Sequence, residues 1–599
     1  MYLRLSKIGI AVFLLGTLLS CDASGPKGPV KKGDYKLVAA HISETMNTYV
    51  HGQGIRGVSI ALVDEGNEVW AAGFGHIDLE GRVTANADSV YQIGSITKLL
   101  TMTVALKLWE QKKLDFHSHI TSYLPDFSIR SVYQEHPVIT PHMLLTHHSG
   151  LPRDLYSGLW QSTDKPLNVI LEDLSKQHVV YPPYYAFSYS NLGYAVLGAM
   201  MAEISGKSFS DLVEREVFNP LGMSRSGFRF GPEPYFSKGY SRDGVMAFPR
   251  LFRDTSAIGA YSSVSDLSRW MRMFLNDGKV GATAYLSPKS VENTFNPQNR
   301  HIGLDFDLSV GLGWFLSDTA LDYDTPVAFH EGNTTEFVSY LAVVPEYKIG
   351  VVILANTVGS DAALKKMAHQ ALSMMIETKT GNKPDRVVTL SEYRPFSGDS
   401  RLLEAKTGYY ATPIGIVKVK RVGNQLETIL GGKKFEFFPT SDSNFRIRYQ
   451  LFPFISVSDS KLDMLEVETL KKGGKNLVVL KYADRRYLIG EKLTPRQFPV
   501  AWKTLNGRYS LVSDGNDEAI VESVEFRHKD GFIFADVYSK WLETQFEIPS
   551  VSVAIKPISE TEALVNGMGS HINGTVTLLD DTGSQFSFSG LIFKRDPSE

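Results

Sequence analysis

The chain has 599 residues, of which 43% are hydrophobic and 21% are charged, and its formal net charge is −3. The composition is that of a globular protein. The chain is too long to fold around a single hydrophobic core, so we expect about two to four domains. The near-neutral charge gives no reason to expect nucleic acid as a partner. The single cysteine, Cys21, excludes an intrachain disulfide.

Residues 1–21 have the pattern of a bacterial lipoprotein signal peptide. Arg4 and Lys7 form a basic start, an apolar stretch follows, and the sequence LLSC at 18–21 resembles a lipobox. We therefore expect cleavage before Cys21, acylation of this residue, and a protein that is lipid-anchored in the bacterial cell envelope, facing the periplasm or the exterior. A plain signal peptide with an incidental cysteine is the alternative.

Residues 22–38 are small, polar and rich in Pro and Gly, which predicts a flexible tether. The segment 39–378 then alternates extended and helical patterns: RGVSIALVD and EVWAAGFGHID predict strands, and an apolar helix is expected from about Ser95 to Lys113. EFVSYLAVV and IGVVILAN, joined by PEYK, predict an antiparallel hairpin. Ser265 is expected to cap the helix in SVSDLSRWMRMFLNDG. The pattern predicts an α/β (α+β) domain, with a sheet flanked by helices and a helical insertion.

The remaining part of the chain changes character. Residues 379–397 predict a linker, and beyond them strands and turns alternate with almost no helix. The sequence LNGRYSLVSDG at 505–515 echoes KTGYYATPIG at 406–415, with an aromatic residue at the start of each β run. This weak repeat predicts two small β-barrels, at 398–497 and 498–599. A single larger β-domain is the alternative.

The apolar helix that begins near Ser95 carries a chemical signal, because Ser95 and Lys98 form a Ser-x-x-Lys pair on one helix face. The free N–H groups of a first helical turn favour an anionic oxygen. Burial would lower the pKa of Lys98, and a shift of about 3 units corresponds to roughly 4 kcal/mol. A neutral amine beside a hydroxyl is a general base for a nucleophile. The same spacing occurs at Ser24, Ser162 and Ser458, but only Ser95 opens an apolar helix; a capping serine with a surface lysine is the alternative.

Two further motifs follow in the chain. FSYSNLGYAVLG contains Tyr189 and Asn191 in the only Tyr-x-Asn sequence, and FHEGNTTEFVSYL contains His330 and Gly332 at the start of a strand. The ordered set resembles the serine β-lactamase and penicillin-binding protein superfamily over about 40–378. It resembles most the class C-like branch (peptidase S12-type), which includes D,D-carboxypeptidases, D-aminopeptidases and esterases. The resemblance implies an antiparallel sheet flanked by helices with a helical subdomain.

The resemblance also implies roles for the motif residues. Ser95 would be the nucleophile that forms an acyl-enzyme, and Lys98 would activate it. Tyr189 would be the second acid or base, a phenol that needs nearby cations to lower its pKa. Asn191 would hold Lys98 and the amide of the substrate by hydrogen bonds. This chemistry requires neither a metal nor an organic cofactor.

The strand from Glu331 is expected to line the substrate cleft, and His330, Gly332 and Asn333 are expected to contact the substrate. The N–H groups of Ser95 and Asn333 would form the oxyanion hole. His330 stands where classical β-lactamases carry a lysine that recognises a carboxylate, and a histidine is mostly neutral near pH 7. This departure weakens the case for efficient β-lactam hydrolysis. The bulk of Asn333 and Thr334 is expected to narrow the cleft.

The function expected from these patterns is hydrolysis of an amide or ester, with a small molecule or a peptide of the cell-wall or D-amino-acid type as substrate and a lipid-mediated contact with the membrane. A carboxylesterase or weak β-lactamase is one alternative, and a non-catalytic binding protein for cell-wall fragments is another. The tail resembles that of D-aminopeptidases; it could instead carry a lipid or sugar. His147 and His148 lack a third metal ligand at a useful spacing, so a structural role is expected for them.

Overall fold

The computed structural model describes residues 32–597, with gaps at 134–136, 160–166, 230–233, 248–249, 319, 322, 384–399, 431–432, 453–454, 458–464, 483–484, 513–520, 540–542, 544–547 and 569. The expected signal peptide with Cys21, most of the expected tether and most of the expected linker lie outside the described residues. Among the helices that are described, none is both long enough and apolar enough to cross a membrane.

An eight-stranded sheet forms the centre of the first domain, in the order β10-β11-β12-β13-β14-β1-β2-β3, and every neighbouring pair is antiparallel. Its strands are β1 (Gly57–Asp64), β2 (Asn67–Asp78), β3 (Val83–Thr84), β10 (Ser309–Val310), β11 (Phe315–Ser317), β12 (Val327–Asn333), β13 (Val338–Val344) and β14 (Ile349–Ala355). β13 and β14 form the predicted hairpin, with Val344 opposite Ile349. Because β1 pairs with β14, strands from the two ends of the domain lie side by side.

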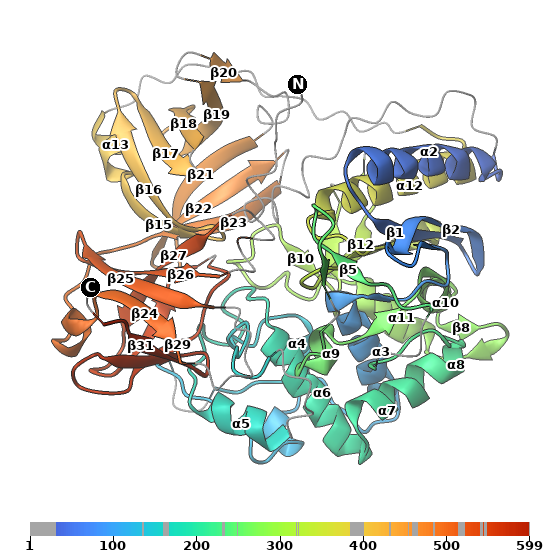
Figure 1. Cartoon of the computed structure of the whole chain (residues 1–599), viewed down its shortest axis with the longest axis horizontal. Coiled ribbons are helices and arrows are strands. Elements are labelled where there is room, and N and C mark those ends of the chain that lie inside the picture. The colour runs from blue at the N-terminus through green and yellow to red at the C-terminus, as the bar shows by residue number, and fades with distance from the viewer. Residues whose placement is uncertain are drawn as a thin grey trace.

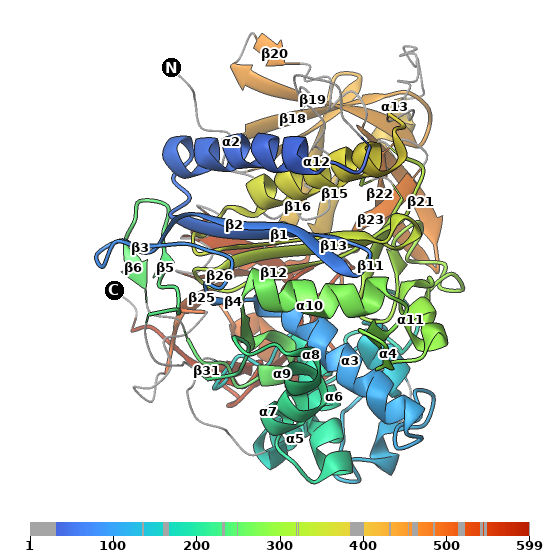
Figure 2. The same cartoon turned by 90° about the vertical axis from the view of Figure 1, so that its right-hand side faces the viewer.

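Helices cover both faces of this sheet. α2 (Lys36–Gly52) and α12 (Asp361–Thr380) lie on one face, and α10 (Val264–Leu275) lies on the other (Figure 2). Successive side chains of a strand point to opposite faces, so Ile60 packs into the core under α2 and α12 whereas Ala61 packs into the core on the α10 side. Since both faces are covered, the strands at the sheet centre are buried along almost their whole length, which explains their continuous apolar sequences.

A helical subdomain is inserted between β3 and β10 (Figure 1). Besides α10, it contains α3 (Thr97–Glu110), α4 (Pro141–Leu145), α5 (Leu167–Ser175), α6 (Asn191–Ser205), α7 (Phe209–Val213), α8 (Asn219–Leu221), α9 (Thr255–Ile258) and α11 (Pro288–Phe295). The predicted cap of α10 was wrong: Ser263, not Ser265, accepts a hydrogen bond from the N–H of Asp266, at 3.2 Å. The helix begins earlier because Val264 is already part of its buried face.

The C-terminal region forms two closed eight-stranded barrels. The first contains β15 (Gly408–Thr412), β16 (Gly415–Val422), β17 (Gln425–Leu430), β18 (Lys433–Pro439), β19 (Asn444–Phe452), β21 (Leu465–Lys472), β22 (Lys475–Tyr482) and β23 (Arg485–Lys492), with β20 (Ile455–Val457) added beside β19. The second contains β24 (Gly507–Leu511), β25 (Ser523–Lys529), β26 (Phe532–Tyr538), β27 (Ser550–Pro557), β28 (Glu562–Asn566), β29 (Thr575–Leu578), β30 (Gln585–Phe588) and β31 (Leu591–Arg595). The predicted fold class is therefore confirmed, and the alternative of a single larger β-domain is wrong.

Packed side chains fill the interior of the second barrel. Tyr509, Phe526, Phe586 and Phe593 are buried there and contact one another, and Trp502 is also buried in this core. Eight strands enclose a space that side chains can fill. This packing argues against the alternative that the second barrel carries a lipid or sugar inside it.

Both barrels contact the first domain, but at different places (Figure 1). In the first barrel, the N–H of Arg486 donates to the carboxylate of Asp307 at 2.8 Å. The second barrel contacts the loops that follow α4: the N–H of Tyr156 donates to the carbonyl of Ser589 at 2.9 Å, and the N–H of His178 donates to a hydroxyl of β29 at 2.8 Å. These loops lead directly into the Tyr-x-Asn sequence.

Candidate active site

Ser95 lies in a single 3₁₀ turn, Gly94–Ile96, immediately before α3. The predicted helix therefore begins at Thr97 rather than at Ser95. Gly94 has a φ of +50°, and a Cβ built on it would lie 2.8 Å from the backbone nitrogen of Asn333. Only glycine lets the turn approach β12 so closely. The approach brings the backbone of Asn333 next to Ser95, as an oxyanion hole formed by their two N–H groups requires.

Lys98 is fully buried, and its ammonium or amine nitrogen has three oxygen neighbours. Nζ lies 3.0 Å from Ser95 Oγ, 2.7 Å from Asn191 Oδ1 and 2.9 Å from the carbonyl oxygen of Ala257. Burial places the pKa of Lys98 well below its ordinary value; the charge of Arg153 acts in the same direction, and the carboxylate of Asp154 opposes it. The predicted direction of this pKa shift is confirmed.

The neighbours of Lys98 determine which atoms its neutral amine can bind. A neutral amine has two hydrogens and one lone pair, and the oxygens of Asn191 and Ala257 can only accept. When these two take the hydrogens, the lone pair is left for the hydroxyl of Ser95, which then donates to Nζ. This is the arrangement of a general base and its nucleophile.

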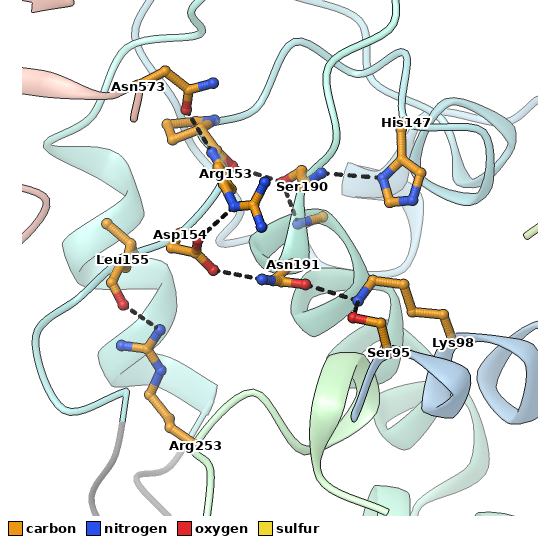
Figure 3. A network of polar contacts seen from close by, with 12 residues as sticks. Ser95, Lys98, His147, Arg153, Asp154, Leu155, Ser190, Asn191, Arg253 and Asn573 are labelled. Atoms are coloured by element: carbon orange, nitrogen blue, oxygen red, sulfur yellow. Dashed lines mark hydrogen bonds and ion pairs between the residues drawn. The ribbon is translucent and has the colours of Figure 1, made fainter. Parts of the chain in front are cut away.

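Asn191 is fixed at the first residue of α6. Its Nδ2 donates to Asp154 Oδ1 at 2.7 Å, so its Oδ1 must face Lys98 (Figure 3). The helix is capped by Ser190, whose hydroxyl accepts the N–H of Gly193 at 2.8 Å. The N–H of Ser190 donates to His147 Nδ1 at 3.1 Å. The side chain that holds Lys98 is therefore fixed by both its amide and its helix.

Tyr189 precedes this helix and lies beside Ser95. Burial raises its pKa above the ordinary value, while a hydrogen bond with Ser95 and the charge of Arg153 act in the opposite direction. The phenol is thus neutral at rest and can donate a proton. The ring stacks on His147 with a centroid distance of 4.3 Å, and Lys98 Nζ lies 4.9 Å from its centroid.

His330 and Gly332 lie on β12. His330 is 2% exposed, and burial together with Lys98 lowers its pKa to about 3, so the ring is neutral as expected. Its Nδ1 contacts the carbonyl oxygen of Glu331 at 2.7 Å, and its buried Nε2 has no hydrogen-bond partner among the described residues. A Cβ on Gly332 would lie 2.1 Å from the carbonyl oxygen of Ile93, so this glycine permits the close approach of strand and turn.

The side chain of Asn333 is not where the sequence predicts it. It makes a hydrogen bond with Asp361 in the first turn of α12, on the face of the sheet opposite to His330. The expectation that its bulk narrows the cleft is therefore wrong. Its backbone N–H remains beside Ser95, so strand alternation separates the roles of the main chain and the side chain at this position.

The two histidines of THHSG have structural partners. His147 accepts the N–H of Ser190. His148 Nε2 lies 2.8 Å from the carboxylate of Asp305, and the side chains of His148 and Asp305 are each 1% exposed. Asp305 also accepts the N–H of Phe187, at 2.6 Å. The histidines thus hold the loop that leads to Tyr189. No group of three or more metal-ligating His, Cys, Asp or Glu side chains occurs among the residues that the structure describes.

Sequence reasoning missed three residues of this polar network: Arg153, Asp154 and Asn573. Asp154 binds Asn191 and forms an ion pair with Arg153 Nε at 3.3 Å, and the N–H of Arg153 donates to Asn573 Oδ1 at 2.8 Å (Figure 3). Arg153 and Asp154 directly follow the SGLP sequence, a signal that could have drawn attention to them. Asn573 stands 420 positions after Arg153 on the second barrel, and no sequence pattern points to it.

Comparisons with known proteins agree with this architecture. The model of the Beta-lactamase family matches residues 39–373. The chain is 27% identical over 325 residues to "Protein flp" of Staphylococcus aureus (strain NCTC 8325 / PS 47). This alignment covers 53% of this chain and 62% of that protein. It is 26% identical over 286 residues to "Beta-lactamase-like protein 2" of Dictyostelium discoideum, covering 45% and 52% of the two chains. The chain thus spans about three fifths or less of the length of these curated relatives.

A solved structure described as an octameric penicillin-binding protein homologue from Pyrococcus abyssi is similar to this chain, with a TM-score of 0.50 and 23% identity. The alignment covers 76% of this chain and all of the other chain. At this identity the similarity supports the fold alone. The family match covers more than half of the chain and contains Ser95, Lys98, Tyr189 and His330. The chain therefore belongs to the β-lactamase family, within the superfamily of serine β-lactamases and penicillin-binding proteins.

Proposed function

We propose that this protein cleaves an amide or ester bond through an acyl-Ser95 intermediate, with a peptide of the cell-wall or D-amino-acid type as substrate. The observation that carries the proposal is the environment of Lys98: a fully buried nitrogen held between the acceptor oxygens of Asn191 and Ala257, with Ser95 Oγ 3.0 Å away. A capping serine with a surface lysine would not be arranged in this way.

The acylation step follows from these contacts. Ser95 gives its proton to Lys98 Nζ while Oγ forms a bond to the carbonyl carbon of the substrate, and the resulting oxyanion lies at the N–H groups of Ser95 and Asn333. Each such donor typically contributes about 2.7–4 kcal/mol to the transition state. The bond to the leaving group then breaks as Tyr189 donates its proton to the departing atom. Lys98 returns the proton that it received to Tyr189, so the protons balance.

Deacylation uses the same groups with water as the nucleophile. A water molecule loses a proton to the amine of Lys98 as its oxygen attacks the acyl carbon. The bond from the carbon to Ser95 Oγ then breaks, and Oγ recovers a proton from Lys98. The products are a carboxylic acid and the alcohol or amine released in the first step, and the enzyme returns to its resting state.

A carboxylesterase is the second candidate, and the state of His330 favours it. A neutral, buried imidazole cannot replace the permanent cation that classical β-lactamases place at this position. Its unpartnered Nε2 can accept a hydrogen bond from the substrate instead. The same feature predicts that β-lactams are at best weak substrates.

The test is mass spectrometry of the full-length protein, incubated with benzylpenicillin or with a fluorophosphonate, beside Ser95→Ala. Labelling of Ser95 by the fluorophosphonate that disappears in Ser95→Ala supports the serine mechanism. A lasting penicilloyl adduct on Ser95 would indicate a penicillin-binding peptidase, and free penicilloate without an adduct a β-lactamase. Failure of both reagents to react with Ser95 would overturn the proposal and favour a non-catalytic binding protein.

We also propose that the protein is anchored by acylated Cys21 and works outside the cytoplasmic membrane. The support is the basic start, the apolar stretch and the LLSC sequence of the first 21 residues. Metabolic labelling with palmitate checks this: the label should enter the natural sequence and be absent from Cys21→Ala. Incorporation into both proteins, or into neither, would contradict the proposal.

A further inference from the structure

Arg153 places a guanidinium group at the edge of the candidate active site. Its Cζ lies 5.3 Å from the ring centroid of Tyr189, the residue that faces Ser95, and its side chain is 31% exposed. Only its Nε is engaged by a carboxylate, that of Asp154, at 3.3 Å. The terminal nitrogens form no hydrogen bond with any residue in the described part of the chain. They are therefore a pair of donors available to a ligand.

The backbone of Arg153 is fixed by hydrogen bonds of both its N–H and its carbonyl oxygen. Its N–H donates to Asn573 Oδ1 at 2.8 Å (Figure 3). Its carbonyl oxygen accepts the N–H groups of Asn191 at 2.8 Å and Leu192 at 3.1 Å. The second barrel and α6 thus hold the same residue. A guanidinium on such a fixed backbone loses less conformational freedom when it binds than one on a free loop.

The other basic groups around Ser95 are already used or neutral. Lys98 serves as the amine beside Ser95, and His330 is neutral. Lys365 pairs with Glu331 at 3.0 Å, and the buried Arg253 pairs with Asp254 at 2.7 Å. Arg153 is therefore the cation with free donors at this site, within the residues that the structure describes.

We propose that Arg153 is a specificity-determining residue that binds an anionic group, a carboxylate, on the leaving side of the scissile bond. The proposal rests on the proposed hydrolase function, in which the neighbouring Tyr189 gives its proton to the leaving group. A planar guanidinium binds a carboxylate through two parallel hydrogen bonds and distinguishes it from a neutral amide. Arg153 thus takes the task that His330 cannot perform.

The second barrel presents this residue. Asn573 lies in the segment between β28 and β29, and its side chain is almost fully buried against the loop of Arg153. His571 of the same segment is buried near Arg153 with its pKa lowered to about 3, so it is neutral and adds no competing charge. Asn573 is therefore a positioning residue for Arg153.

The experiment compares two thioesters of N-phenylacetylglycine, one with mercaptoacetate and one with mercaptoacetamide as the leaving thiol, on the full-length protein. The two probes differ only in a carboxylate on the leaving side. We expect the natural protein to prefer the mercaptoacetate ester. Arg153→Gln should lower kcat/KM for this ester roughly 10- to 100-fold more than for the neutral one, whose own decrease reports only the loss of the Arg153 charge near Lys98 and Tyr189. Arg153→Lys keeps the charge but not the planar pair of donors. Its kcat/KM for the mercaptoacetate ester should lie between those of the natural protein and Arg153→Gln.

Arg130→Gln is the matched control, because Arg130 also pairs across the interface with the second barrel, at Glu562, but does not contact Tyr189. It should leave the preference between the two esters unchanged. Equal loss for both esters in Arg153→Gln, or no preference in the natural protein, would overturn the inference while leaving the acyl-Ser95 mechanism intact. If Ser95 reacts with neither ester and with no phosphonate, the proposed function fails and the inference fails with it.

Discussion

The two sides of Ser95 differ in how completely their polar atoms are used. On the Lys98 side, Nζ has three fixed neighbours from the catalytic domain, namely oxygens of Asn191, Ala257 and Ser95 itself. On the Tyr189 side, His330 Nε2 is unpartnered among the described residues, and Arg153 has free donors and is held by the second barrel. The first side provides the chemistry of acyl transfer, and the second has unpaired polar atoms, of which the exposed donors of Arg153 can take part in a choice between substrates.

Replacement of Lys98 should produce the largest loss, because no other group on its side can accept the proton of Ser95. We expect Lys98→Met to lower the rate of Ser95 acylation by about 10³-fold or more, within or above the range for general-base catalysis. The loss should be equal for the carboxylate and the neutral thioester. The measurement is stopped-flow release of the thiol, with circular dichroism to check folding.

Methionine approximates the length of lysine, but the oxygens of Asn191 and Ala257 lose their donor. Each unsatisfied buried acceptor costs about 1–3 kcal/mol, so the melting temperature of Lys98→Met should also decrease. A folded Lys98→Met protein that acylates at the natural rate would contradict the assignment of Lys98 as the base.

Tyr189→Phe tests the other side with a smaller expected effect. The phenol donates a proton to the leaving group, so its loss should matter more for a poor leaving group than for a good one. We expect a loss of about 10²-fold for an anilide and less than about tenfold for a thioester with the same acyl group. Equal losses for the two substrates would indicate that Tyr189 has no role in protonating the leaving group.

The pH dependence of the rate distinguishes the two sides again. Lys98 must be unprotonated to accept a proton, and its lowered pKa means that activity should increase with pH through a value well below 10.5 and then level off. Tyr189 must be protonated to donate, and its raised pKa places the loss of activity on the alkaline side above pH 10. Below the pKa of Lys98, the rate should fall about tenfold per pH unit. A profile of kcat/KM for the neutral thioester checks this; a rate that stays constant until the ordinary pKa of lysine and increases only there would contradict it.

How far the sequence predicts this site depends on where each residue stands in the chain. The neighbourhood of Ser95, Lys98 and Asn191 could be predicted because short motifs on helix starts carry it, and the burial of Lys98 follows from the apolar helix around it. The sheet hairpin and the two barrels could be predicted from strand patterns and the repeat. The contact of Asn573 with Arg153 could not, because it depends on how separate domains pack and leaves no periodic signal in either segment.

The same reasoning explains the errors. Ser263 and Ser265 are both good helix caps by composition, and only the packing of Val264 decides between them. The direction of the Asn333 side chain follows from the alternation along β12: because His330 and Gly332 face the site, Asn333 faces the other side of the sheet, and the expectation of a narrowed cleft did not include this alternation. In both cases a shift of one or two residues changes the role of a side chain without changing the element.

Asn573→Ala should give the smallest of these effects and the most specific one, because Asn573 acts only through Arg153. The loss of one hydrogen bond to a backbone N–H corresponds to about 0.5–1.5 kcal/mol, so kcat/KM for the mercaptoacetate thioester should fall roughly 3- to 10-fold. The neutral thioester should be almost unaffected, and the effect should be absent when Arg153 is already glutamine.

Arg486→Gln is the matched control on the first barrel, where Arg486 contacts Asp307 away from Ser95. It should change neither ester by more than about twofold. If Arg486→Gln lowers the preference for the carboxylate ester as much as Asn573→Ala does, then both barrels act through the general stability of their interfaces with the catalytic domain. Asn573 would then have no specific role in positioning Arg153 on the Tyr189 side of Ser95.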